Sequence, residues 1–360
     1  MTTAWALPPA DSPLADAPAR LGPYEVVGSI AEGGMGIVVK GQDPVTGQVV
    51  ALKTVRGPRL SSAASIRREI VALGQMSHPG IVGLVAHGTW DDKPWMALEL
   101  LEGRTVCDEI DLLWRKGPEG LFQAQHGRCR SEDLPTMPSD VRAARRAGPR
   151  AAWSAPRVAA AGRLHDVVGI AMNLCAALDY IHTLGLVHRD VKPSNVFLGG
   201  DGRVTLLDFG LVCAARGIPG TGATADSCVG TMEYAAPEQI RGEPVDARAD
   251  IYSLGCVLYE LVTGRRPADV DGRDDDRGRP RAREALAPSA LVSGVPPALD
   301  DLLAAMLAAR PEDRPASAAA VAARLATLPT AAPEARQPAS LNPMMTAQTA
   351  RTEAATITIV

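Results

Sequence analysis

The first third of the chain alternates short apolar runs with glycine and charged residues. Most of these runs are the length of one β-strand, and glycine or polar residues separate them. From Ile66 to Met76 the apolar residues instead recur at three- and four-residue spacing, which predicts a helix. The strand candidates are residues 24–30, 37–39, 49–55, 81–90 and 93–101. We therefore predict a lobe of five strands and one helix over residues 23–100.

A second patterned region begins near residue 165 with a long apolar helix. Val167, Ile170, Leu174, Leu178 and Ile181 fall on one helical face, and Gly185 marks its end. The remaining elements are short strands at Val187, 196–198 and 204–207, an apolar helix over 250–261 and two closing helices before residue 327. This region predicts a larger, mainly helical lobe over residues 101–327, so the fold class is α+β.

Three segments lack a sustained period. Residues 1–22 and 328–360 are rich in alanine and proline with little apolar bulk, and we predict disordered tails there. Residues 104–164 interrupt the second lobe, and from Arg142 to Arg163 they contain arginines without an acidic residue. We interpret this segment as an exposed, partly disordered insertion in preference to a docking site.

Composition excludes several classes of protein. The chain is 46% hydrophobic with a net charge of −4, which disfavours a nucleic-acid-binding surface. Its six cysteines are scattered without a C-x-x-C pair, which is typical of reduced thiols in a cytoplasmic protein. We see no secretory signal, and no apolar run approaches the ~18 residues of a membrane span.

The chemistry is concentrated between Leu186 and Gly210. Asp190, Lys192, Asn195 and Asp208 supply two acids, a cation and an amide on loops at the ends of predicted strands. These groups can hold Mg²⁺ on a polyphosphate and accept a proton from an attacking hydroxyl.

Two upstream features fit the same chemistry, although each has a simpler interpretation. Gly33, Gly34 and Gly36 let a hairpin turn approach phosphates closely, but a plain glycine-rich hairpin has the same pattern. Lys53 lies in an apolar strand, where burial requires an anionic partner, and Glu69 is a candidate. A solvent-facing lysine and a solvated helix acid remain the alternatives.

Taken in order, these motifs resemble the catalytic domain of eukaryotic-like (Hanks-type) serine/threonine protein kinases, most closely the bacterial branch. The resemblance spans about residues 23–327 and implies a bilobal protein-kinase-like fold. The motifs are EGGMGIV at 32–38, VALK at 50–53, Glu69, HRDVKPSN at 188–195, DFG at 208–210, GTMEYAAPEQ at 230–239, DIYSLG at 250–255 and Arg314.

The resemblance assigns a role to each polar residue. Lys53, paired with Glu69, would hold the α- and β-phosphates of ATP, and Asp208 with Asn195 would hold Mg²⁺, for which Mn²⁺ could substitute. Asp190 would accept the proton of the substrate hydroxyl while Lys192 neutralises charge on the γ-phosphate. Lys192 followed by Pro193 resembles enzymes that act on serine and threonine. Thr231 would contact Asp190 and the peptide.

The remaining implied nucleotide contacts come from the first lobe and the hinge. Glu99 and Leu101 would offer backbone groups to adenine, and Leu98 would limit access to the deeper part of the nucleotide pocket. The other implied cofactor-binding residues are Ile30, Gly33, Gly34, Gly36, Val38 and Ala51. Ala31 stands where the family pattern has its first glycine, and we expect it to alter nucleotide affinity at most. Glu238 would pair with Arg314 to fix the peptide-binding loop.

The resemblance also implies control. Arg189 would bind a phosphate placed on Thr221, Thr224 or Ser227 by autophosphorylation, which a transient homodimer would permit. The partners implied are protein substrates. The C-terminal tail has two open interpretations: its threonines are autophosphorylation sites that recruit a phosphothreonine-reading domain, or they only keep the tail soluble. These threonines are Thr346, Thr349, Thr352, Thr356 and Thr358. Two alternatives remain open: a nucleotide-binding scaffold that acts through the arginine-rich insertion, and a small-molecule phosphotransferase of kinase-like fold.

Overall fold

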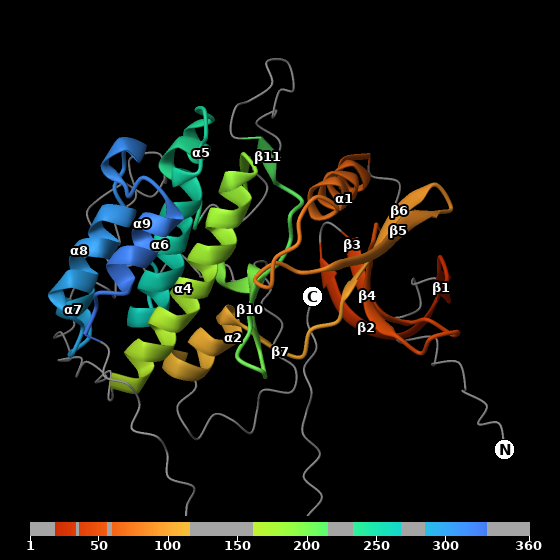
Figure 1. Ribbon diagram of the computed structural model, residues 1–360, viewed down its shortest axis with the longest axis horizontal. Coiled ribbons are helices and arrows are strands. Elements are labelled where there is room, and N and C mark those ends of the chain that lie inside the picture. Colours follow the sequence, from red (N-terminus) through yellow and green to blue (C-terminus); the bar gives the residue numbers. More distant parts are fainter. Residues whose placement is uncertain are drawn as a thin grey trace, which may run out of the picture.

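The computed structural model has two lobes, a curled β-sheet with one helix and a larger bundle of helices (Figure 1). The structure describes residues 19–33, 36–55, 60–115, 161–214, 233–267 and 285–329. The predicted α+β fold class with a β-rich N-lobe and a helical C-lobe is confirmed.

The N-lobe is one six-stranded antiparallel sheet in the order β1-β2-β3-β4-β6-β5. Helix α1, Leu60–Leu73, packs against β6 and β5. The strands are β1 (Arg20–Leu21), β2 (Tyr24–Gly33), β3 (Gly36–Gln42), β4 (Val49–Thr54), β5 (Leu84–Trp90) and β6 (Lys93–Glu99).

The prediction of a tail through residue 22 is wrong for its last residues. Leu21 is 1% exposed and pairs with Tyr24, so β1 closes the edge of the sheet. Gly22 has φ +58°, and a Cβ there would lie 2.2 Å from the ring of Trp95. A two-residue strand leaves no periodic pattern, which explains why the sequence did not reveal it.

Alternation along β4 divides the N-lobe interior into two clusters. Val50 and Leu52 join Trp95 in a cluster confined to this lobe. Ala51 faces the other way, into a cluster that continues down the C-lobe to its closing helices. Because side chains alternate along a strand, Lys53 lies on the same face as Ala51, toward the second lobe.

The C-lobe is built around α4 (Ala161–Thr183) and α6 (Arg248–Thr263), which pack against each other. Helix α9 (Ala318–Leu325) covers α4, and α8 (Pro297–Met306) covers α6. The shorter elements are α5 (Pro237–Arg241), α7 (Pro288–Leu291), β8 (Leu186–Val187), β9 (Val196–Gly199), β10 (Val204–Leu206), β11 (Cys213–Ala214), η3 (Pro193–Asn195) and η6 (Pro311–Asp313).

The predicted insertion begins later than residue 104, because residues 103–115 have regular structure. Strand β7, Gly103–Thr105, pairs with β9, and Thr105 then caps α2, Val106–Ile110. The Thr105 hydroxyl accepts from the Asp108 amide, and the Asp108 carboxylate accepts from the Thr105 amide. A π-helical turn, η1 (Asp111–Arg115), follows. Elements this short depend on pairing with distant residues and show no period.

Among the described residues, only the stretch Leu164–Thr183 of α4 is long and apolar enough to cross a membrane by length and composition. Half of that stretch is buried inside the protein, and Leu174, Leu178 and Ile181 are almost completely covered. Its burial shows that α4 is the central helix of the C-lobe core.

Candidate active site

The catalytic loop follows β8 and is fixed by a buried carboxylate from α6. Asp250 is completely buried, and its two oxygens accept from the backbone N–H groups of His188 and Arg189, each at 2.8 Å. The same carboxylate lies 2.8 Å from His182 Nε2. Arg189 has φ +67°, a left-handed conformation that is strained for a non-glycine residue. Asp250 therefore holds a strained turn directly before Asp190.

His188 supports the loop from inside. Its imidazole is fully buried, lies 3.1 Å from the Leu207 carbonyl through Nε2, and accepts from the Asp190 amide through Nδ1 at 3.2 Å. The two partners are compatible with one neutral tautomer, in which Nε2 carries the proton. The ring also meets Phe209 edge-on, 4.8 Å between centroids. Sequence reasoning assigned no role to His188 or Asp250; the signal for Asp250 was an acid inside a strongly apolar helix.

The carboxylate of Asp190 is oriented by two donors. Lys192 Nζ lies 2.8 Å from Asp190 Oδ2, and Asn195 Nδ2 lies 3.0 Å from the same oxygen. Asn195 also donates to the Asp190 carbonyl at 2.9 Å. Within the described residues these contacts use Oδ2, which leaves Oδ1 to receive a proton.

Lys53 joins the two lobes. Its ammonium lies 2.8 Å and 3.0 Å from the two oxygens of Glu69 on α1, and 3.2 Å from Asp208 Oδ1. The ion pair expected from the sequence is thus present, and it is well shielded, because the side chains of Lys53 and Glu69 are 14% and 2% exposed. Glu69 also accepts from the Phe209 amide at 3.3 Å.

The charges of this triad shift its pKa values unequally. Burial alone would lower the pKa of Lys53, but Glu69 and Asp208 outweigh it and raise that pKa. Burial would raise the pKa of Asp208, yet Lys53 holds it below its ordinary value. For Glu69 burial is the largest effect and, with the charge of Asp208, raises its pKa despite Lys53. Glu69 is therefore the first of the two acids to take up a proton as the pH falls.

Asp208 and Asn195 offer the oxygen ligands that Mg²⁺ prefers. Asn195 uses its amide nitrogen for Asp190, so its oxygen is left for a cation. Among the described residues no group of three or more His, Cys, Asp or Glu side chains could hold a metal by itself. The pair fits a cation that is completed by substrate phosphates and water.

The predicted nucleotide-lining residues lie on the inner face of the N-lobe sheet and at its hinge. Val38 and Ala51 are buried in the shared cluster, and Ile30 packs against it. Leu98 is 2% exposed and pairs with Ala51 across the sheet. Leu101 is buried at the start of the C-lobe.

The glycine hairpin and the hinge each show a constraint that the sequence did not reveal. Gly33 pairs with Gly36 at the end of the β2–β3 hairpin, and Gly34 lies outside the described residues. A Cβ on Gly36 would lie 2.2 Å from the Thr54 carbonyl, so strand packing by itself requires this glycine. At the hinge, the Glu99 amide donates to the Gly83 carbonyl at 2.9 Å, which ties the end of β6 to the segment before β5.

The side chain of Glu99 points toward the C-lobe. Its oxygens lie 2.8 Å and 3.0 Å from the guanidinium of Arg203, which follows β9. Arg203 Nε donates to the Pro79 carbonyl at 2.6 Å. This pair lines a groove of about 470 Å³ behind the hinge.

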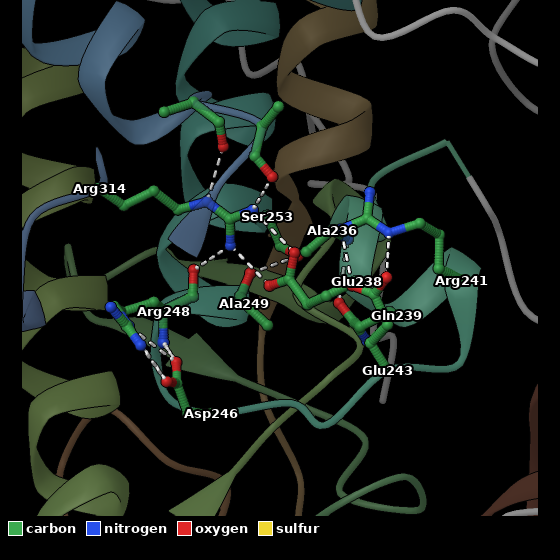
Figure 2. A network of polar contacts seen from close by, with 12 residues as sticks. Ala236, Glu238, Gln239, Arg241, Glu243, Asp246, Arg248, Ala249, Ser253 and Arg314 are labelled. Atoms are coloured by element: carbon green, nitrogen blue, oxygen red, sulfur yellow. Dashed lines mark hydrogen bonds and ion pairs between the residues drawn. The ribbon is translucent and has the colours of Figure 1, made fainter. Parts of the chain in front are cut away.

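A buried ion pair fixes α5, the short helix that contains Glu238. Figure 2 shows the Arg314 guanidinium facing the Glu238 carboxylate, with contacts of 2.6 Å and 2.8 Å. Arg314 also donates to the Arg248 carbonyl at 3.0 Å, at the start of α6. The expected Glu238–Arg314 pair is present. Thr221, Thr224, Ser227 and Thr231 lie outside the described residues.

Comparison with known proteins places this arrangement in a family. Residues 24–128 and 159–325 match the family described as protein kinase domain. The chain is 30% identical over 79% of its length to a probable serine/threonine-protein kinase PknB of Bifidobacterium longum, and it covers 36% of that relative. It is 31% identical to PksC of Streptomyces coelicolor and 32% identical to PknL of Mycobacterium tuberculosis, both named serine/threonine-protein kinases.

For PksC the match covers 79% of this chain and 45% of the relative, and for PknL 78% and 59%. The chain thus spans between about a third and three fifths of the length of these relatives. The relatives are bacterial, in agreement with the branch that the motifs resemble. The chain belongs to the protein kinase family, in its bacterial Hanks-type serine/threonine branch.

Proposed function

We propose that this chain transfers the γ-phosphate of ATP to serine or threonine hydroxyls of proteins. One observation supports it most: the Lys53–Glu69 pair, the acid Asp208 and the oriented acid Asp190 are all in place in one structure. The names of the relatives agree with this activity.

The residues divide the reaction between them. Lys53 would hold the α- and β-phosphates, while Asp208 and the Asn195 oxygen would hold Mg²⁺, which neutralises phosphate charge. Asp190 Oδ1 would orient the substrate hydroxyl and receive its proton. The hydroxyl oxygen bonds to the γ-phosphorus as the bond between that phosphorus and the leaving ADP oxygen breaks. Lys192, already at Asp190, would balance charge on the transferring group.

Labelled ATP with Mg²⁺ and a mixed acceptor such as casein tests the proposal. We expect label on serine and threonine with the wild type and almost none with Asp190→Ala. A nucleotide-binding scaffold would bind ATP without transfer, and a small-molecule phosphotransferase would label added metabolites but no protein. Lack of transfer to protein by the wild type would refute the proposed function.

Control through Arg189 is the second part of the proposal. Among the described residues, Arg189 Nε is buried without a hydrogen-bond partner, although a buried donor normally has one. A phosphate on Thr221, Thr224 or Ser227 would supply the missing acceptor and order the loop. Changing these three residues together to alanine should therefore lower activity sharply, and full activity in that variant would end this part of the proposal.

The location and partners of the protein complete the proposal. We place it in the cytoplasm, where thiols stay reduced; Cys175 and Cys256 are free thiols in the described part of the chain. A transient homodimer would serve autophosphorylation. Phosphorylation of the C-terminal threonines would recruit a phosphothreonine-reading domain, and mass spectrometry of the autophosphorylated chain would identify those sites.

A further inference from the structure

Helix α1 contacts the Asp208–Gly210 turn at two points, of which the ion-pair residue Glu69 supplies only one. Glu69 accepts from the Phe209 amide at 3.3 Å. One helical turn earlier, the Ser65 hydroxyl donates to the Gly210 carbonyl at 3.3 Å. Residues four apart lie on the same face of a helix, so both contacts form together when α1 docks.

The turn that these contacts hold is strained. Asp208 has φ +57°, which a non-glycine residue adopts only when its surroundings impose it. The Gly210 amide donates to Asp208 Oδ1 at 3.3 Å, so the position of Gly210 bears directly on the metal-binding carboxylate. A hydrogen bond to the Gly210 carbonyl therefore restrains Asp208 through the backbone between Asp208 and Gly210.

Ser65 also packs closely on this turn. A Cβ built on Gly210 would lie 2.6 Å from the Ser65 hydroxyl and 3.3 Å from Asp208 Oδ1. Gly210 does not have a positive φ, so an alanine there would meet no backbone strain. The hydroxyl of Ser65 is thus the nearest obstacle to a side chain at residue 210.

We infer that Ser65 is a positioning residue for phosphoryl transfer. Its hydroxyl couples the docking of α1 to the placement of Asp208, in parallel with the Lys53–Glu69 ion pair. The inference rests on the proposed kinase activity. Glu69 connects the docked helix to Lys53, whereas Ser65 connects the same helix to the Gly210 carbonyl at the end of the Asp208 turn.

The first test replaces the hydroxyl. Ser65→Ala in the full chain should lower kcat for casein phosphorylation by about 2- to 10-fold, the effect of one neutral hydrogen bond. It should also raise the Mg²⁺ concentration needed for half-maximal rate, without changing the KM for casein. Ser65→Thr keeps the hydroxyl and should restore both values. Ser62→Ala makes the same chemical change on the same helix and should match the wild type.

The second test measures coupling between Ser65 and Gly210. Gly210→Ala should lower kcat in the wild-type background, because its methyl group displaces the Ser65 hydroxyl. In the Ser65→Ala background the same substitution should cost clearly less, because the two changes remove one contact. If thermal unfolding shows that the Gly210 variants do not fold, the role of Ser65 is judged from Ser65→Ala and Ser65→Thr alone.

The outcomes separate the two proposals. An inactive wild type refutes the kinase activity itself. An active wild type with Ser65→Ala unchanged in kcat and in Mg²⁺ requirement overturns the role of Ser65 while leaving the kinase activity intact. Fully independent effects of Ser65→Ala and Gly210→Ala would overturn it as well. A Ser65→Ala variant that loses activity only by melting at a lower temperature, and is not rescued by threonine, indicates a merely structural role and likewise contradicts the inference.

Discussion

Replacing Asp250 by asparagine tests how the catalytic loop is held. The carboxylate accepts from His188 N–H through one oxygen and from Arg189 N–H through the other. Asparagine has the same shape but only one oxygen, so its NH₂ group must face a backbone donor. One buried N–H then loses its acceptor, which costs about 1–3 kcal/mol.

That loss should appear in both stability and activity. In a domain of this size 1 kcal/mol corresponds to about 2–4 °C in Tm, so Asp250→Asn should lower Tm by about 2–12 °C. Because Arg189 is strained, the freed turn relaxes and moves Asp190, so kcat should fall even at temperatures where the variant is fully folded.

Thermal unfolding and casein phosphorylation at 20 °C measure the two effects. Asp246→Asn is the matched control: this carboxylate is 44% exposed, so water can replace the contacts with Arg248 that asparagine cannot make. An Asp250→Asn variant with the Tm and kcat of the wild type would show that the carboxylate does not hold the loop.

Three further predictions concern other parts of the site. Glu238→Gln leaves Arg314 buried without its counter-charge and should lower the free energy of unfolding by about 3–5 kcal/mol, measured by urea denaturation. Gly36→Ala places a methyl against the Thr54 carbonyl and should lower Tm even without nucleotide, measured by calorimetry. Because the pKa of Glu69 is raised above its ordinary 4.5, its protonation on acidification should define an acid limb of kcat/KM. Glu69→Gln should lower activity and move that limb to lower pH in a pH–rate profile.

Local pattern predicted those parts of the fold that are long or chemically distinctive. The apolar face of α4 and the alternation in β4 were visible because each repeats over many residues. The polar groups were visible because four such residues in one short stretch are unusual: Asp190, Lys192, Asn195 and Asp208. The order of the motifs along the chain then led to the family.

What the sequence did not reveal depends on contacts between distant residues. Strand β7 exists because it pairs with β9, nearly a hundred residues later, and no local pattern signals such a pairing. Asp250 lies 62 residues from His188, and Ser65 lies 145 residues from Gly210. A serine in a helix has no sequence pattern that marks a function, so only the packed structure identifies the hydroxyl that contacts the Asp208 turn.

Two strained residues of the site, Arg189 and Asp208, are each held by a helix, but the two helices differ in how deeply they are buried. Arg189 depends on a buried acid from α6, and Asp208 depends on a turn that Glu69 of α1 contacts. Helix α6 is buried in the C-lobe core and cannot leave without unfolding that lobe. Helix α1 exposes Arg67, Arg68 and Val71 and contacts mainly β5 and β6. Displacing α1 therefore costs less than displacing α6, because it uncovers less apolar surface. It follows that Asp190 is positioned whenever the C-lobe is folded, whereas the placement of Asp208 can vary with the docking of one helix.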